Sequence, residues 1–138
     1  ETGHVVFATM HTTNALTTIN RIVSMFAPHE QVEASKRLSE NLKAIIAQQM
    51  LPANTPSGIV VAQEIMLSGP GVRDCISGKD ELSRLNAIIA SGGGRTDGIM
   101  KSFDQHIFKL YQDKMISKET ALEYATSETD FIQKLNFE

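Results

Sequence analysis

The sequence has 138 residues, of which 41% are hydrophobic and 21% charged, and its formal net charge is −3 at neutral pH. This composition is that of an ordinary globular domain, and no basic run is longer than two residues, which argues against nucleic-acid binding through a broad basic surface. The single cysteine, Cys75, cannot form an internal disulfide, and no apolar run reaches the ~18 residues of a membrane span.

The first predicted element is a short strand. Residues 5–10 form an almost unbroken apolar run, which is typical of a strand buried on both faces of a parallel sheet. His4 and His11 stand at its two ends, and residues 12–14 (Thr-Thr-Asn) can each cap a helix. His11 would therefore lie beyond the carboxyl end of a strand and beside a helix N-terminus, where open α/β sheets bind ligands and anions.

Two helices are predicted next. Residues 14–26 carry apolar side chains at three- and four-residue spacing, and this helix ends before Pro28 because the residue before a proline avoids the helical region. A longer helix is predicted over about residues 29–51. Its inner face would be formed by Leu38, Leu42, Ile45, Ile46, Gln49 and Met50.

A second buried strand is predicted over residues 59–67, after a turn at residues 52–58 that contains two prolines. Gln63 and Glu64 interrupt this strand, and we interpret Glu64 as a paired structural carboxylate. A sheet of only two strands is at best marginally stable. We therefore expect further strands upstream, and we expect the sequence to be a fragment because no methionine precedes Glu1.

The remaining elements are short helices. Pro70 is placed to begin one that Gly78 ends, and Asp80 is predicted to cap the next. The inner face of that second helix would be Leu82, Leu85, Ile88 and Ile89. Residues 91–94 (Ser-Gly-Gly-Gly) end it and mark a predicted boundary between a core, residues 1–92, and a helical subdomain, residues 93–138. Three helices are predicted there, beginning at a Ser102–Gln105 capping box, at Ser117 and at Ser127.

The glycines at 92–94 do not form a phosphate-binding loop. A Walker A loop requires Gly-x-x-x-x-Gly-Lys-Ser/Thr, whereas Arg95-Thr96-Asp97 follows Gly94. No metal site is predicted either, because His4 and His11 would lie ~23 Å apart along a strand and lack a nearby third ligand. From these residues alone, structural or solvated histidines remain an alternative to a functional pair.

Residues 1–4, the apolar run and residues 9–13 (Thr-Met-His-Thr-Thr) resemble the His box of the secretion ATPase superfamily, in particular its PilT/PilU-type pilus retraction branch. The resemblance covers most of the chain. It implies an α/β fold, namely the C-terminal half of a RecA-like P-loop ATPase domain with a helical tail. It also implies that His11 senses the γ-phosphate, with Thr12 and Thr13 as supporting donors, and that His4 is structural or links phosphate state to subunit packing.

Residues 71–78 resemble the Ala-Ile-Arg-Asn-Leu-Ile-Arg-Glu motif of the same branch, which is needed for retraction and lies near subunit contacts. The match is partial, because Ser77-Gly78 replaces the terminal Arg-Glu. The alternative is a short surface helix that packs two apolar residues inward, with Cys75 as a small buried residue. The candidate interface residues are Val72, Arg73, Asp74 and Ile76.

By resemblance, the intact protein would be a cytoplasmic homo-hexamer at the inner-membrane base of a type IV pilus, in contact with the platform protein. It would use ATP and Mg²⁺ to drive pilus disassembly and twitching motility. The family's Walker A, Asp box and Walker B residues are absent from this sequence, so the chain alone is expected neither to hydrolyse ATP nor to bind it tightly. The alternatives are a related type II or type IV secretion ATPase and a truncated, non-enzymatic paralogue that regulates the motor.

Overall fold

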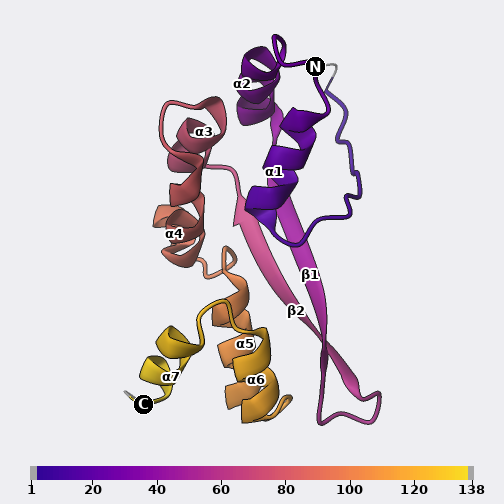
Figure 1. The fold of residues 1–138 in the computed structure, drawn as a ribbon, viewed down its shortest axis with the longest axis vertical. Helices are drawn as coiled ribbons and strands as arrows, with labels where there is room; N and C mark the ends of the chain where they lie inside the picture. Colours follow the sequence, from indigo (N-terminus) through magenta and orange to yellow (C-terminus); the bar gives the residue numbers. More distant parts are fainter. Residues whose placement is uncertain (1–2, 137–138) are drawn as a thin grey trace.

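A long β-hairpin runs through the molecule, and the helices pack along it. The computed structural model describes residues 3–136, so Glu1, Thr2, Phe137 and Glu138, including the first two positions of the His-box resemblance, lie outside the described residues. Helices α1–α4 lie beside one half of the hairpin and α5–α7 beside the other (Figure 1). The elements are α1 (Ala15–Ser24), α2 (Gln31–Asn41), β1 (Ala44–Pro52), β2 (Ile59–Leu67), α3 (Pro70–Ser77), η1 (Leu82–Arg84), α4 (Leu85–Ala90), η2 (Gly92–Gly94), α5 (Phe103–Gln112), α6 (Lys118–Tyr124) and α7 (Glu128–Asn136).

The predicted helix over residues 29–51 is wrong in its second half. Helix α2 ends at Asn41, and β1 then pairs antiparallel with β2 from Ala44↔Leu67 to Pro52↔Ile59. Leu42 has the extended φ of −63° and ψ of 129°. The apolar residues from Leu42 to Leu51 fit both a helical spacing and the alternation of a strand. The segment forms a strand because β2, which is later in the sequence, supplies its hydrogen-bond partners.

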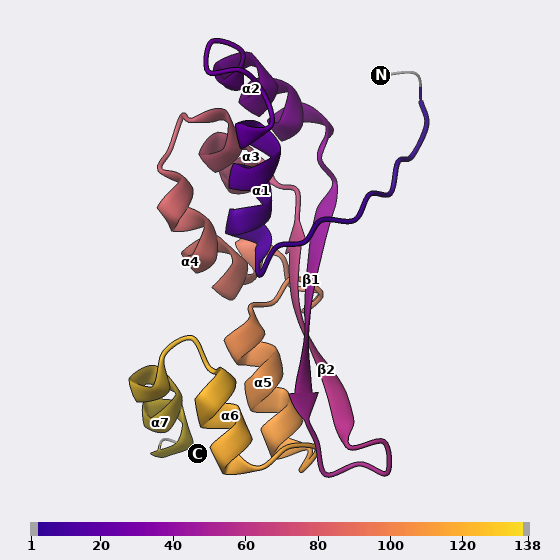
Figure 2. The ribbon, with the colours of Figure 1, turned by 45° about the vertical axis from the view of Figure 1, so that its right-hand side comes forward.

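The predicted strand at residues 5–10 is also wrong in this structure. The segment is extended but belongs to no strand, and Val5, Val6 and Phe7 are 81%, 81% and 95% exposed. Figure 2 shows it leading away from the start of α1 past the hairpin. A strand buried on both faces needs neighbours on each edge, and within residues 3–136 the two strands present pair with each other.

The local signals at helix ends are confirmed. Asn14 caps α1 and accepts a hydrogen bond from the backbone N–H of Thr17, and Ser102 and Gln105 form the capping box of α5. Pro70 is the first residue of α3, and Gly78 ends it at a φ of +80°, a conformation that favours glycine. The serines predicted to cap α6 and α7, Ser117 and Ser127, accept hydrogen bonds from backbone N–H groups of those helices.

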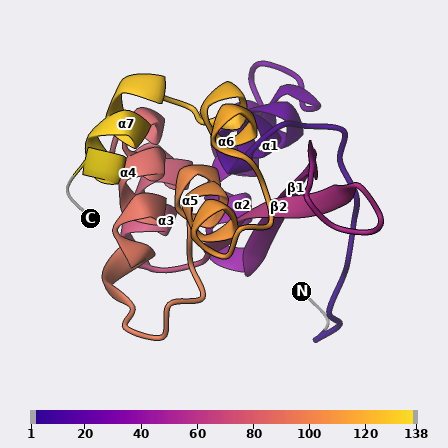
Figure 3. The same ribbon diagram turned by 90° about the horizontal axis from the view of Figure 1, so that it is seen from below.

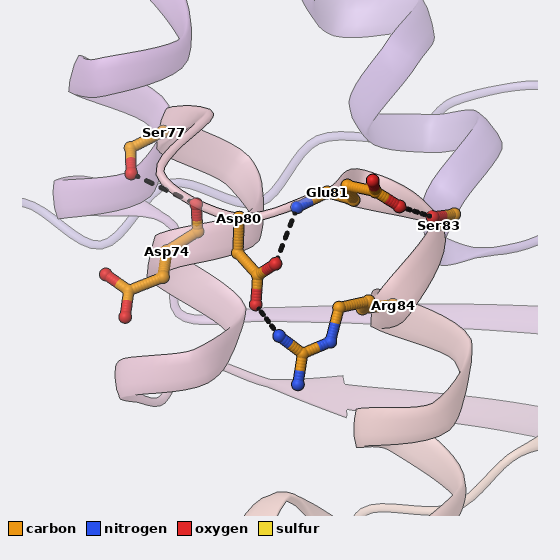
Figure 4. A network of polar contacts seen from close by, with 6 residues as sticks. All are labelled: Asp74, Ser77, Asp80, Glu81, Ser83 and Arg84. Atoms are coloured by element: carbon orange, nitrogen blue, oxygen red, sulfur yellow. Dashed lines mark hydrogen bonds and ion pairs between the residues drawn. The ribbon is translucent and has the colours of Figure 1, made fainter.

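The predicted role of Asp80 as a helix cap is wrong. Glu81 rather than Asp80 precedes the 3₁₀ turn η1, which runs directly into α4. Figure 4 shows the Asp80 carboxylate accepting from the N–H of Glu81 and from the guanidinium of Arg84. These contacts stabilise the bend between α3 and η1, because they tie the residues before and after it together.

Two hydrophobic clusters lie at the two halves of the hairpin. Met66 of β2 belongs to the cluster formed with α1, α3 and α4, and Ala62 of the same strand belongs to the cluster formed with α5, α6 and α7. Glu64 lies between them on the same face of the strand, because residues two apart share a face. Figure 3 shows α5 and α6 side by side against the hairpin, where α5 contacts β2 and α6 contacts β1.

Candidate functional site

The candidate nucleotide residues lie in the segment that enters α1. His11 and Thr13 are exposed and Thr12 is half-buried, all immediately before the cap residue Asn14. His4 is exposed and lies seven positions before His11 on the same extended segment. The structure therefore brings residues 11–13 to the start of α1, as the sequence indicated.

Both threonine hydroxyls are turned toward the first turn of α1. Thr12 Oγ1 lies 2.6 Å from Thr18 Oγ1, whose proton is donated to the carbonyl of Asn14 at 2.7 Å. Thr13 Oγ1 lies 3.3 Å from Thr17 Oγ1, which also donates to Asn14. Each hydroxyl has a single proton. The protons of Thr12 and Thr13 are therefore used within the chain, so in this arrangement both threonines brace the loop rather than offer donors to a ligand.

Three backbone N–H groups at the start of α1 have partners within the chain. Ala15 N–H donates to Glu64 Oε1 at 2.8 Å, Thr17 N–H donates to the Asn14 side chain at 2.8 Å, and Thr18 N–H donates to the Asn14 carbonyl. A helix N-terminus binds an anion through such groups when they are unpaired. In this chain a carboxylate of its own, that of Glu64, already takes the first of them.

Glu64 is the structural carboxylate that the sequence predicted. Its side chain is only 7% exposed, and its partner is the backbone of Ala15, 49 positions away. Burial raises the pKa of this carboxyl above its usual range, and the nearby charge of Asp104 adds to the rise, while backbone N–H groups of Ala15 and Phe103 oppose it. Glu64 therefore fastens the entrance of α1 to the middle of β2.

The candidate interface motif forms helix α3. Val72 and Ile76 are buried in the cluster shared with α1 and α4, Cys75 is buried beside them, and Arg73 is exposed. This arrangement agrees with the surface-helix alternative for the apolar positions, and it leaves Arg73 and the half-exposed Asp74 turned outward. Figure 4 shows the backbone of Asp74 joined to Ser77 at the end of the helix.

An open pocket of about 440 Å³ adjoins this helix. Its wall is formed by the entry to α3, the end of α4 and the glycine segment, and it includes Arg73, Ile88, Arg95 and Met100. Gly92, Gly93 and Gly94 have φ values of +75°, +60° and +79°, so this segment is a helix-terminating link, as predicted, and the element directly before it is α4 rather than a strand.

Sequence reasoning missed His106. Its Nδ1 accepts a hydrogen bond from the N–H of Gln63 at 2.8 Å, on the edge of β2 that β1 does not cover. Burial lowers the pKa of His106, and the positive charge of Lys101 lowers it further. No local pattern signals this contact, because it depends on how α5 packs against the hairpin.

Residues 3–136 contain no group of three or more His, Cys, Asp or Glu side chains arranged to hold a metal ion. Within the same range, no helix is both long and apolar enough to cross a bilayer.

Residues 1–123 match the model of the type II/IV secretion system protein family, and the chain belongs to this family. Among its relatives is a twitching motility protein of Neisseria gonorrhoeae, 36% identical over 121 residues, which are 88% of this chain and 31% of the relative. The type IV pilus retraction ATPase PilT of Pseudomonas aeruginosa is 35% identical over 131 residues, 95% of this chain and 37% of the relative. PilU of the same species is 35% identical over 94% of this chain and 33% of its own length.

The fold agrees with these relationships. The crystal structure of the pilus retraction motor PilT with bound ADP superposes with a TM-score of 0.80 at 31% identity, covering 96% of this chain and 36% of that one. The ATPase DotB of Yersinia pseudotuberculosis shares the fold, with a TM-score of 0.70 over 88% of this chain and 30% of DotB. The prediction of a fragment of the ATPase fold with a helical tail is confirmed, and the chain spans about a third of the length of its relatives.

Proposed function

We propose that the intact protein to which this chain belongs is a type IV pilus retraction ATPase that couples ATP hydrolysis to pilus disassembly and twitching motility. The observation that carries this proposal is the 35% identity to the retraction ATPase PilT over 95% of the chain. The intact protein would act as a homo-hexamer in the cytoplasm, at the inner-membrane base of the pilus and against the platform protein. Residues 1–92 would belong to the motor core and residues 93–138 to a helical subdomain.

We assign the γ-phosphate contact to His11. The exposure of this side chain and its position three residues before the α1 cap support the assignment. Bound ATP with Mg²⁺ would supply the phosphoanhydride whose hydrolysis drives the motor. His11 would hold the terminal phosphate, and release of that contact would shift the first turn of α1, as in other γ-phosphate switches. Thr12 and Thr13 would brace the loop, and His4 would connect the same segment to the neighbouring subunit.

The 138-residue chain alone would not hydrolyse ATP. Its sequence contains no Gly-x-x-x-x-Gly-Lys-Ser/Thr loop, so the phosphate cradle and the Mg²⁺ ligands would come from the rest of the intact protein. The test compares ATP turnover by the intact protein and by this chain. We expect the intact protein to hydrolyse ATP and the 138-residue chain not to. An inactive intact protein, or turnover by the chain that His11→Ala abolishes, would overturn the proposal.

Helix α3 would be an interface needed for retraction, through its outward residues Arg73 and Asp74, with Val72 and Ile76 holding it in place. In the intact protein, Arg73→Glu should abolish twitching motility while ATP turnover stays within about twofold of the wild type. The control is Lys118→Glu, which reverses an exposed charge at the start of α6. Unchanged motility in Arg73→Glu would exclude this role.

Two alternative functions can be distinguished by ATP turnover of the intact protein and by deletion of its gene. A related type II or type IV secretion ATPase would also hydrolyse ATP, but deletion of its gene would stop secretion of a protein or DNA substrate and leave twitching motility intact. A non-enzymatic regulatory paralogue would bind motor subunits without any turnover of its own. The four-cysteine zinc insertion typical of type II secretion ATPases is absent from this sequence, which supports the retraction branch.

A further inference from the structure

Three successive residues in the middle of β2 each contact a segment distant in sequence. Gln63 N–H donates to His106 Nδ1 of α5 at 2.8 Å. Ile65 exchanges two backbone hydrogen bonds with Lys101, just before α5, at 2.8 and 3.0 Å. Glu64, between them, accepts from Ala15, the first residue of α1, at 2.8 Å. This short section of strand therefore joins the entrance of α1 to the entrance of α5.

The Glu64 carboxylate faces the first residues of both helices. Ala15 follows the cap Asn14, and Phe103 follows the cap Ser102. The backbone N–H groups of Ala15 and Phe103 both lower the pKa of the Glu64 carboxyl, against the rise that burial causes. The carboxylate accepts its hydrogen bond from Ala15, and a carboxylate is favoured at a helix N-terminus. It lies between the two hydrophobic clusters, on the face of β2 that carries Ala62 and Met66.

Neither helix needs Glu64 in order to begin. Each has a complete capping box of its own, Asn14 with Thr17 and Ser102 with Gln105. A carboxylate that is 7% exposed is costly to bury, and an apolar side chain would fill the same space without that cost. What the carboxylate adds is a directional connection between two helix ends that contact different clusters. An apolar residue would let the ends shift independently.

We propose that Glu64 is a positioning residue that couples the nucleotide-contacting segment before α1 to helix α5 of the C-terminal subdomain. The proposal rests on the proposed function, in which nucleotide acts on residues 11–14. A displacement of Ala15 on phosphate release would change its hydrogen bond to Glu64, and the carboxylate would pass the change to the section of β2 that is bonded to Lys101 and His106. The coupled helix α5 lies in the half of the molecule formed by α5–α7 (Figure 1).

The test is amide hydrogen exchange in the intact protein, with and without a non-hydrolysable ATP analogue, for segments 11–19 and 101–112. In the wild type both segments should respond to nucleotide. In Glu64→Gln, which keeps the size but removes the charge, segment 11–19 should keep its response and that of segment 101–112 should fall at least about threefold. Glu64→Asp, which keeps the charge but withdraws the oxygens, should have the same effect. Glu123→Gln, an exposed change on α6, is the matched control and should behave as the wild type.

Four results would overturn the proposal. Wild-type responses at both segments in Glu64→Gln and Glu64→Asp would show that the carboxylate is not the connection. Loss of the response at both segments in these variants would make Glu64 part of the site itself rather than a link. A wild-type segment 101–112 that does not respond would show that there is no coupling to transmit. A wild-type segment 11–19 that does not respond would instead contradict the proposed function, and the coupling with it.

Discussion

The N–H of Gln63 donates a hydrogen bond of 2.8 Å to Nδ1 of His106, so a side chain of α5 provides the acceptor for an N–H on the outer edge of strand β2. An edge N–H without a partner is costly when water is excluded. The imidazole can accept this hydrogen bond only while Nδ1 carries no proton. The contact therefore makes the attachment of α5 to the hairpin sensitive to pH.

Acidification should destabilise the chain through His106. Its pKa is lowered in the folded state, by burial first and by Lys101 second, below the ordinary value of 6.5. The unfolded chain then binds the proton more readily, so the contribution of His106 is complete above pH 6.5 and is lost as the pH falls through the folded-state pKa. In His106→Gln, whose amide oxygen can accept from Gln63 but does not titrate, urea unfolding should depend less on pH between about 7.5 and about 5.

The control for this experiment is His29→Gln, which removes an exposed histidine in the turn between α1 and α2. It should keep the wild-type dependence on pH. An equal slope in His106→Gln and the wild type would contradict the role assigned to the Gln63 contact.

Ser102→Ala should lower the free energy of unfolding by about 1 kcal/mol, because it removes the oxygen that accepts from Gln105 N–H at the start of α5. Gln105 also donates to the carbonyl of Ala90, so the cap helps to hold α5 against the end of α4. Urea denaturation measures the loss. Ser102→Thr should retain most of the stability, and Thr129→Ala, an exposed change within α7, should cost much less. Equal losses in Ser102→Ala and Thr129→Ala would exclude a specific capping effect.

The outer edge of β1 should promote self-association of the isolated chain. Within residues 3–136 no strand pairs with that edge, and Ile46 and Met50 are 59% and 71% exposed. Charged residues on an edge strand discourage pairing between molecules. Met50→Lys should therefore reduce the average mass measured by light scattering. Val32→Lys is the matched control, because it adds the same charge at an 80% exposed site on α2. Equal effects of the two variants would rule out the edge as the contact.

Sequence reasoning succeeded at most positions where the signal is local, with Asp80 as the exception. Asn14, Ser102, Ser117 and Ser127 lie at helix starts, and Gly78 lies at a helix end, because a cap depends on residues three or four positions away. The buried positions of α3 also follow from helical spacing within a few residues.

The strand over residues 59–67 was predicted with the bounds it has, but two other elements that depend on distant partners were predicted wrongly. Residues 44–52 form a strand because β2 pairs with them, although their spacing also fits a helix. Residues 5–10 have the composition of a buried strand, but that assignment requires neighbouring strands that residues 3–136 do not supply. Glu64 was recognised as structural, whereas its contact with Ala15, 49 positions away, could be seen only in the fold.

The most direct test of the account is ATP turnover by the intact protein carrying His11→Ala. If His11 contacts the γ-phosphate in the transition state, the turnover number should fall at least about tenfold with the fold retained. His29→Ala, which removes another exposed histidine, should leave turnover unchanged. Wild-type turnover and wild-type twitching motility in His11→Ala would contradict the assignment of this segment to the nucleotide site.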